Sequence, residues 1–528
     1  MRVPFCPPFL AGEPRATGLL PDRFRSRAAW REEVEARRGR KLAPALLRSL
    51  AARSRELPPS AARERNLDAL AQPGTVAVVT GQQVGLFLGP LYTVYKAATA
   101  IAWAAAVERE TGARCVPIFW LQTEDHDFAE IAGCCVPAPG EPPLKLSLPA
   151  VERRCSVAHV TLPPEVAGLV AALEGATSAL PEAASILPLV RAAYQPGRPI
   201  SAAFAHLLAA VFAEEGLVVL DPRCSDLAPL AAPINRAALE QADAIDAALL
   251  RRGLELEQAG LAEQVHVRSG SPLVFFHPEG SEGPRHRLQR AGAGFRLDSG
   301  AEVAIADVLA AAARNPLRLS TSALLRPIVQ DALLPAVAYV GGPAEIGNLA
   351  QTAVLYPLFD VRPAMPVPRA RFRLVDPRSA TRLSELGLSA ADVEVPREQL
   401  LEQLGAARAG LPSADEIAKA LLAGMPDRID ALAAARPALD RAARRTRFTV
   451  ERAAARFAAR QARLIAAEDR TLAERIDLLQ SILYPECTPQ ERVHSLPWFA
   501  ARFGLHALKA SIFAAIVPGQ ASVKDLTP

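Results

Sequence analysis

Three carboxylates and one imidazole, Glu124, Asp125, His126 and Asp127, follow closely after the apolar segment 115–121. Neighbouring carboxylates shift one another's pKa values and can orient a histidine for proton transfer. Asp125, His126 and Asp127 are therefore our candidate catalytic residues. The same cluster could instead ligate a metal or hold an ammonium group, and the structural alternative is a helix N-cap, for which Asp is a preferred residue.

A glycine-rich loop, GQQVGLFLGP at 81–90, forms the second candidate site. It matches neither GxGxxG nor GxxxxGK[ST], but its glycines let the backbone approach a ligand, and the N-terminus of the helix that follows offers free N–H groups to an anion. The alternative is a plain tight turn. The candidate binding residues here are Gly81, Gln82, Gln83, Gly85, Gly89, Pro90, Tyr92, Thr93 and Lys96.

A third set of polar and glycine residues surrounds the apolar segment 337–340. Its members are Arg326, Gln330, Gly341, Gly342 and Glu345. The planar guanidinium of Arg suits a phosphate or a carboxylate, although an exposed helix face would also explain the pattern. Because ligands bind outside the carboxyl ends of parallel strands, we expect all three sets to converge on one cleft.

The elements that must position these residues alternate between strand and helix. Unbroken apolar runs predict buried parallel strands at 75–80, 115–121, 217–220 and 337–340. Amphipathic or apolar stretches predict helices at 91–109, 201–215, 224–251 and 305–314, besides N-terminal helices at 25–38 and 41–55. A strand, a loop, a helix and a second strand make a βαβ unit, so the fold class is α/β with a doubly wound parallel sheet.

Two insertions and a helical region interrupt this pattern. Short strands are expected at 264–268 and 273–277. Residues 437–483 form a predicted 47-residue helix in which Val450, Phe457 and Leu464 recur every seven residues. With 413–435 as its hairpin partner, this helix predicts a coiled coil whose remaining apolar stripe is covered in a homodimer. The predicted divisions are 1–135 (first half of the core), 136–200 (first insertion), 201–252 (core), 253–303 (second insertion), 304–384 (second half of the core), 385–485 (helical hairpin) and 486–528 (C-terminal return to the core).

The amino-acid composition limits the classes of protein to which the chain can belong. Half of the residues are apolar and the net charge is +4, which excludes a disordered chain and gives no basic field for nucleic acid. The N-terminus lacks the apolar stretch of a secretion signal, and the longest apolar run, 97–107, is too short for a membrane span, which needs about 20 residues. Seven cysteines without a CxxC pair predict reduced thiols and a cytoplasmic protein, and they mark no residues as a metal site, although the sequence does not tell whether a metal is bound. The small net charge favours a small molecule or another protein as the partner.

Four strings together resemble one family, the bacillithiol biosynthesis cysteine-adding enzymes: VVTGQQVGLFLGPLYTVYK, VPIFWLQTEDHDFAEI, LLRPIVQDALLPAVAYVGGPAEI and LYPECTPQERV. The resemblance spans residues 76–503. It implies a Rossmann-like core with two connecting insertions, a C-terminal coiled coil that forms a dimer, and distant kinship to class I cysteine ligases. The implied reaction is the ATP-dependent joining of the cysteine carboxyl group to the amine of glucosaminyl-malate.

The chain departs from the class I ligase pattern at two places. GPLY stands where those ligases have HIGH, and the candidate second signature, LSTS at 319–322, has no lysine. Adenylate formation by the usual residues is therefore not predicted. Two alternatives remain open from the sequence: a related amino-acid ligase with another amino-sugar acceptor, and a non-catalytic nucleotide-binding scaffold protein.

Overall fold

The computed structural model describes residues 2–150, 155–408, 414–468, 470–521 and 523–528. The chain divides into two compact units. The first unit comprises Met1–Val136, Lys145–Phe372 and His494–Lys524, and the second comprises Pro137–Leu144, Arg373–Val493 and Asp525–Pro528. Both predicted insertions, apart from residues 137–144, therefore fall in the unit that holds the parallel sheet.

A five-stranded parallel sheet lies at the centre of the first unit. Its order is β12 (Met365–Pro368), β11 (Ala336–Gly341), β1 (Val76–Gln82), β2 (Cys115–Leu121) and β5 (Val218–Leu220). All four predicted strands are confirmed, and the apolar residues of β2 are buried throughout, as a sheet covered on both faces requires. Strand β12 was not predicted.

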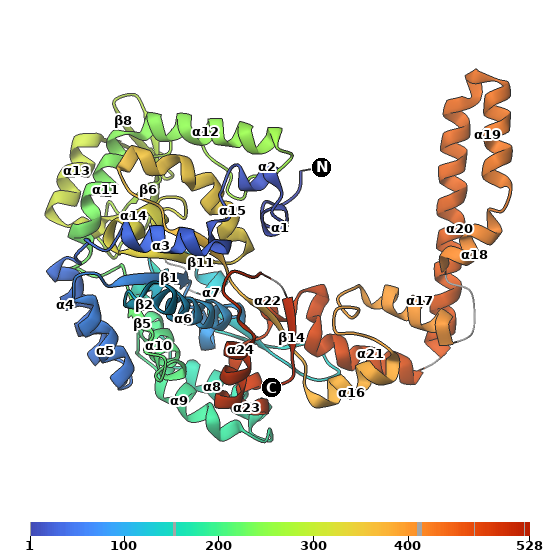
Figure 1. The fold of residues 1–528 in the computed structure, drawn as a ribbon, viewed down its shortest axis with the longest axis horizontal. Helices are drawn as coiled ribbons and strands as arrows, with labels where there is room; N and C mark the ends of the chain where they lie inside the picture. Colours follow the sequence, from blue (N-terminus) through green and yellow to red (C-terminus); the bar gives the residue numbers. More distant parts are fainter. Residues whose placement is uncertain (1, 151–154, 409–413, 469, 522) are drawn as a thin grey trace. The chain divides into compact units, whose positions relative to one another are not determined.

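The sheet is wound in two directions from its middle. Helix α6 (Tyr92–Thr111) connects β1 to β2, whereas α15 (Pro343–Thr352) follows β11 and leads toward β12. Figure 1 shows these two helices on opposite sides of the sheet, as right-handed crossovers in opposite directions require. The strand order therefore reverses between β1 and β11, which is where open α/β sheets bind ligands.

The remaining helices of the first unit cover the sheet and its edges. They include α3 (Arg27–Glu35), α4 (Pro44–Arg55), α5 (Ala61–Leu70), α10 (Ile200–Val211), α11 (Ala228–Glu240), α12 (Ala242–Gln258), α13 (Ile305–Arg314) and α14 (Arg326–Leu333). The single helix predicted at 224–251 is wrong, because the chain leaves helical geometry at Gln241 and forms α11 and α12 instead. No helix among the described residues is both long enough and apolar enough to cross a membrane.

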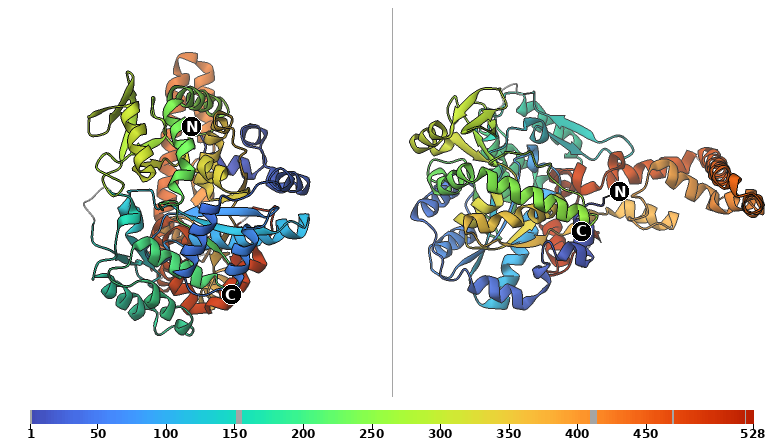
Figure 2. Two further views of the ribbon diagram at one scale, coloured as in Figure 1. Left: turned by 90° about the vertical axis from the view of Figure 1, so that its left-hand side faces the viewer. Right: turned by 90° about the horizontal axis from the view of Figure 1, so that it is seen from above.

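A second, antiparallel sheet combines strands of the predicted second insertion with β10, which lies beyond it in the range predicted as the second half of the core. Its order is β10 (Leu319–Thr321), β6 (Val274–Phe276), β7 (His286–Ala291), β8 (Gly294–Leu297) and β9 (Glu302–Ala304). In Figure 2 the yellow-green segment that carries it lies at the margin of the first unit. The strand predicted at 264–268 is wrong: the backbone of Gln264 and Val265 is hydrogen-bonded to the side chain of Gln351 rather than to a strand.

A smaller two-stranded sheet follows the carboxyl end of β2. It consists of β3 (Gly133–Val136) and β4 (Leu144–Ser147), and β4 lies in the predicted first insertion. Helices α8 (Val166–Thr177) and α9 (Leu187–Ala193) complete this part of the chain before α10 returns to the sheet.

The second unit is mainly helical. It contains α16 (Pro377–Leu386), α17 (Arg397–Arg408), α18 (Ala414–Leu421), α19 (Met425–Ala435), α20 (Asp440–Glu468) and α21 (Arg470–Leu483). The predicted long helix begins at Asp440 instead of 437, since residues 437–439 form a 3₁₀ turn, and position 469 lies outside the described residues. Helix α20 contacts α17, α18 and α19.

The predicted seven-residue seam is only partly covered within this chain. On α21, Leu472 and Ile476 are fully buried, and on α20 Ala458 is buried as well. Phe457 and Leu464, by contrast, are 58% and 60% exposed. The predicted hairpin is thus present as packed helices, while a coiled coil between two chains stays a prediction.

Candidate active site

The reversal of strand order between β1 and β11 gathers five predicted residues and Tyr339, which was not predicted. We call this set the switch-point group: Gln82, Lys96, Arg326, Gln330, Tyr339 and Glu345. Lys96 Nζ donates to the carbonyl oxygen of Gly81 at 2.8 Å and to Gln82 Oε1 at 2.7 Å. It also forms an ion pair with Glu345. The Glu345 carboxylate accepts the backbone N–H of Gly342 at 2.9 Å, which caps α15.

Arg326 extends this group toward α14. It donates to Tyr339 Oη at 3.1 Å and to Gln330 Oε1 at 3.0 Å, and Tyr339 in turn donates to Glu345. Burial lowers the pKa of Lys96, with Glu345 opposing the shift. Burial by itself would raise the pKa of Glu345, but Lys96 holds it below its usual range. The Lys96 and Glu345 charges thus neutralise each other, whereas the Arg326 guanidinium is held by the neutral oxygens of Tyr339 and Gln330.

Close packing explains the glycines of the loop between β1 and α6. A Cβ atom on Gly85 would lie 3.0 Å from the Gly89 Cα, and Gly89 has a φ of +62°, which favours glycine. Tyr194 closes the loop, since its hydroxyl donates to Gly85 O and accepts the N–H of Leu88, both at 3.3 Å. Residues 83–89 are buried. Gly85 and Gly89 therefore have a packing role, and their binding role stays a prediction.

Three further predicted residues, Pro90, Tyr92 and Thr93, lie at the end of this loop. Pro90 pairs with Ser495 in an isolated bridge, and Thr93 is buried on the first turn of α6. Tyr92 is half-buried and accepts a hydrogen bond from Gln82 at 3.4 Å. Of these three, only Tyr92 is hydrogen-bonded to a member of the switch-point group, Gln82.

A different set of residues meets at the carboxyl end of β2. We call it the β2-edge group: Gln83, Asp125, His126 and Arg285. Arg285 Nη1 lies 3.2 Å from Asp125 Oδ1 and 3.3 Å from His126 Nδ1. Gln83 Nε2 donates to Asp125 Oδ2 at 3.0 Å, and the backbone N–H of His126 donates to Asp125 Oδ1 at 2.7 Å. His126 Nδ1 also lies 3.4 Å from Asp125 Oδ1.

Arg285 was not predicted, and it comes from the antiparallel sheet region. Its Nε donates to Ser320 Oγ at 3.2 Å and its Nη2 to the carbonyl of Thr321 at 2.6 Å, while its guanidinium lies 3.7 Å from the centre of the Phe275 ring. His277 Nε2 lies 3.1 Å from the same Ser320 Oγ. A buried chain of contacts therefore runs from His277 through Ser320 to Arg285 and the Asp125 carboxylate.

The charges in this chain shift the pKa values of its members. Burial alone would raise the pKa of Asp125, but the hydrogen bond with His126 and the Arg285 charge hold it far below its usual range. Burial and the charge of Arg223 lower the pKa of His277 to about 3. Asp125 is thus an anion, and His277 is neutral near pH 7. Such a carboxylate can orient an imidazole and stabilise its protonated form.

Asp127 does not belong to the β2-edge group. Its side chain accepts the backbone N–H of Glu130 at 3.3 Å and caps the short helix α7 (Phe128–Ile131). The N-cap alternative weighed for the acidic run is therefore confirmed for Asp127, while Glu124 binds Thr321 on β10 instead. Asp125 and His126 remain as the acid–base candidates.

Hydrogen bonds and ion pairs thus sort the predicted residues into two groups, where a single cleft was expected. Consecutive residues connect them, since Gln82 accepts from Lys96 in one group and Gln83 donates to Asp125 in the other. Arg285 follows Asp125 by 160 positions in the sequence, so no local motif marks it as a site residue. Across the described ranges, no group of three or more His, Cys, Asp or Glu side chains is placed to hold a metal ion.

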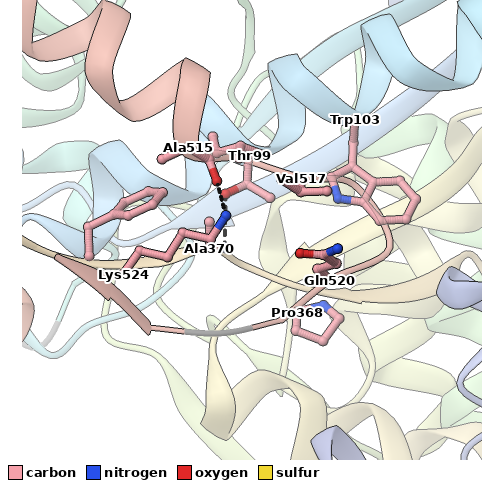
Figure 3. A pocket seen from close by; sticks show the side chains of 10 residues that line it. Thr99, Trp103, Pro368, Ala370, Ala515, Val517, Gln520 and Lys524 are labelled. Atoms are coloured by element: carbon pink, nitrogen blue, oxygen red, sulfur yellow. Dashed lines mark hydrogen bonds between the residues drawn. The ribbon is translucent and has the colours of Figure 1, made fainter. Parts of the chain in front are cut away.

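The first unit also contains two hollows. Figure 3 shows one of about 310 Å³, including space open to solvent, where Lys524 Nζ donates to Ala515 O at 2.6 Å. None of the predicted site residues lines it. The other, of about 400 Å³ on the same measure, is lined by Glu124, which precedes the acid–base pair in the chain.

Comparison with known proteins identifies relatives over most of the chain. Residues 3–370 match the family described as "Bacillithiol biosynthesis BshC, N-terminal Rossmann-like domain". A protein of Solibacter usitatus named "Putative cysteine ligase BshC" is 37% identical over 459 residues, which cover 85% of this chain and 84% of the relative. A protein of the same name from Koribacter versatilis is 34% identical over 84% of this chain and 82% of its own length.

Proposed function

The chain belongs to the BshC family of bacillithiol biosynthesis, and we propose that it is an ATP-dependent ligase that joins cysteine to the amine of glucosaminyl-malate. Relatives that bear the name cysteine ligase support an enzyme that forms a carbon–nitrogen bond. The observation that carries the proposal further is the Asp125–His126–Arg285 arrangement at the carboxyl edge of the sheet. The acceptor sugar and the use of ATP are parts of the proposal.

Amide formation needs an amine that loses a proton as it attacks an activated carboxyl group. His126 is the proposed base, because Asp125 can accept its Nδ1–H and leave Nε2 to take the proton. The oxygens of Asp125 accept from Gln83, Arg285 and the backbone of His126, so its proposed task is to orient His126 rather than to hold the amine.

The nucleotide is assigned to the β1–β11 edge, where parallel sheets that reverse their strand order bind such ligands. Gln82, Tyr92 and Arg326 are half-buried there, so a ligand can reach them without disrupting the core. ATP supplies the driving force by activating the cysteine carboxyl group. The related ligase with another acceptor differs only in the sugar, and the scaffold alternative predicts no nucleotide binding.

The proposal is tested by supplying the purified chain with cysteine, glucosaminyl-malate and ATP and measuring bacillithiol by mass spectrometry. We expect product that requires the enzyme and ATP. If the folded protein binds ATP, makes no product with this acceptor and makes an amide with another amino sugar, the related ligase is the correct function. Folded protein that binds no ATP would favour the scaffold.

We further propose that the chain is a homodimer through helix α20. Phe457 and Leu464 lie seven residues apart, so they share one helical face, and both are mostly exposed in the single chain. Replacing both by Asp should lower the mass measured by light scattering from that of a dimer to the 56.2 kDa of one chain. Arg470, an exposed residue on α21, offers a matched control as Arg470→Asp. A wild-type protein of monomer mass at micromolar concentration contradicts the proposal.

A further inference from the structure

The second, antiparallel sheet places three side chains around Arg285 from one of its faces. Phe275 and His277 are two positions apart, so they project from the same face, and the His277 N–H continues the ladder beyond β6 by donating to the Arg318 carbonyl at 2.9 Å. Ser320 on β10 pairs with Phe275 across the ladder, so its side chain lies on that face as well. Both His277 and Ser320 are fully buried.

The hydrogen bonds of His277 set the direction of the contacts around Ser320. His277 Nδ1 lies 3.1 Å from the carbonyl oxygen of Gly283, which can only accept, so Nδ1 carries the proton. Burial and the Arg223 charge lower the pKa of His277 to about 3, which leaves its Nε2 without a proton near pH 7. The Ser320 hydroxyl, 3.1 Å from Nε2, therefore donates to it and keeps its lone pairs for Arg285 Nε at 3.2 Å.

The orientation of the Arg285 guanidinium follows from these contacts. Ser320 accepts from Nε, and the carbonyl of Thr321 accepts from Nη2 at 2.6 Å. Because the guanidinium is planar and rigid, fixing these two nitrogens also fixes Nη1. Nη1 lies 3.2 Å from Asp125 Oδ1 and 3.3 Å from His126 Nδ1. The hydroxyl of a buried serine thus determines where a charge lies beside the acid–base pair.

We propose that Ser320 and His277 are positioning residues for proton transfer. They act through Arg285: the Ser320 hydroxyl, oriented by His277, holds Nε, and Nη1 of the same rigid group keeps Asp125 and His126 in place. A neutral histidine suits this task because it accepts from the hydroxyl without adding a second charge beside Arg285. The inference rests on the proposed ligase function, since the acid–base pair is assigned to that reaction.

The first test measures the kinetics of bacillithiol formation in Ser320→Ala. The variant releases Arg285 Nε, so we expect kcat to fall by about tenfold and the pH profile of the reaction to change. The KM values for ATP, cysteine and glucosaminyl-malate should stay unchanged, because the hydroxyl is assigned no contact with a substrate. Full kcat with an unchanged pH profile overturns the inference.

A matched control separates positioning from a general loss of packing. Ser379 on α16 of the second unit is also fully buried, and its hydroxyl donates to Asp376. Ser379→Ala therefore removes a buried hydrogen bond of the same kind, and it should keep the kcat and pH profile of the wild type at equal amounts of folded protein. Equal losses of kcat in Ser320→Ala and Ser379→Ala contradict a positioning role.

A double variant tests whether Ser320 acts through Arg285. Lysine has no Nε–H at the position that Ser320 contacts, so Ser320→Ala combined with Arg285→Lys should be no slower than Arg285→Lys alone. Losses that multiply would show that Ser320 acts by another route and would overturn the inference.

Two variants at His277 keep the test decisive if Ser320→Ala folds poorly. His277→Gln can place an amide oxygen near the position of Nε2 and keep an acceptor for the Ser320 hydroxyl, whereas His277→Leu has none. We expect kcat of the leucine variant to be about threefold below that of the glutamine variant, the value of one neutral hydrogen bond. Equal kcat in the two variants would overturn the role of His277.

Histidine NMR distinguishes a failure of this inference from a failure of the proposed function. The chain has eight histidines, so the imidazole signal of His126 is assigned as the one missing in His126→Asn. We expect Ser320→Ala to shift this signal and Ser379→Ala to leave it in place. A signal that follows Ser320 in a protein without ligase activity would support the coupling and contradict the proposed function. An active ligase in which neither the rate nor the signal responds to Ser320→Ala would do the reverse.

Discussion

The switch-point group and the β2-edge group lie at the same edge of one sheet but satisfy their charges in different ways. In the switch-point group, Lys96 contacts two oxygens of β1 besides the Glu345 carboxylate, and Lys96 is almost fully buried. In the β2-edge group, His126 is half-buried, and its imidazole lies 3.4 Å from the Asp125 carboxylate and 3.3 Å from Arg285.

This difference separates polar groups that stabilise the fold from polar groups that are available for the reaction. A buried ion pair that is complete within the protein holds neighbouring elements together, here β1, α6 and α15, and leaves little for a substrate to bind. An imidazole oriented by an anion and partly open to solvent retains an unused nitrogen for proton transfer. We therefore propose proton transfer at the β2 edge and treat the core of the switch-point group as a structural support beside the proposed nucleotide site.

The largest effect is expected from Asp125→Asn. The amide cannot stabilise a protonated His126, and it leaves the buried Arg285 without its carboxylate partner. The rate of amide formation should fall by about 10²- to 10⁴-fold, the usual contribution of acid–base catalysis. Asp127→Asn is the matched control because Asp127 only caps α7, and an equal loss in both variants would refute the assignment.

At the switch point, Lys96→Met should act on stability first. Removing one partner of a buried ion pair leaves Glu345 uncompensated, and the expected loss is about 3–5 kcal/mol in the free energy of unfolding. Urea titration measures it, and adding Glu345→Gln should restore part of the loss. Arg470→Ala removes an exposed ion pair with Glu474 and should cost at most about 1 kcal/mol. Equal small losses at both sites would contradict the structural role of Lys96.

Arg285→Lys probes how the second sheet supports the β2 edge. Lysine keeps the charge but cannot contact Asp125, Ser320 and the Thr321 carbonyl together, because it lacks the planar fork. We expect the rate of amide formation to fall by about tenfold, equivalent to roughly 1.4 kcal/mol, and the pH profile of the reaction to change. Arg287→Lys, on the adjacent strand β7, is the control. An unchanged pH profile would exclude a positioning role.

The last variant, at His277, concerns the stability of the protein in acid. Its pKa falls from 6.5 to about 3 in the folded protein, so the unfolded chain binds the proton first as the pH drops. The stabilising contribution is therefore complete above pH 6.5 and is lost progressively toward pH 3. His277→Gln should show a shallower decline in the free energy of unfolding over this interval, whereas His506→Gln, at an exposed position of helix Leu505–Ala515, should follow the wild type.

The sequence predicts those parts of the molecule that local physics determines. The apolar run at 115–121 becomes β2 with the predicted bounds, and the helix at 305–314 becomes α13, because burial and periodicity act within each segment. The segment 264–268 alternates apolar and polar residues as a strand does. Its backbone N–H groups at Gln264 and Val265, however, donate to the side chain of Gln351 on the distant helix α15. A contact of this kind has no local signal.

In the candidate site, too, the residues determined by the local sequence were predicted and those determined by distant contacts were not. Asp125 and His126 were predicted because a polar run after a buried strand must lie at the edge of the sheet. Arg285 was missed because it reaches that edge from another sheet through Ser320 and Thr321, and Asp127 was over-assigned because a capping aspartate looks the same in sequence as a catalytic one. The expected single cleft became two groups since Gln82 and Gln83 enter different contacts.

The most direct test of this account compares His126→Asn with Tyr339→Phe in one assay of bacillithiol formation by mass spectrometry, with equal amounts of folded protein. His126 belongs to the β2-edge group, and Tyr339 donates to Glu345 in the switch-point group. We predict product from the wild type and from Tyr339→Phe, and a loss of at least about 100-fold in His126→Asn. Full activity in His126→Asn together with loss in Tyr339→Phe would contradict the placement of the chemistry at the β2 edge.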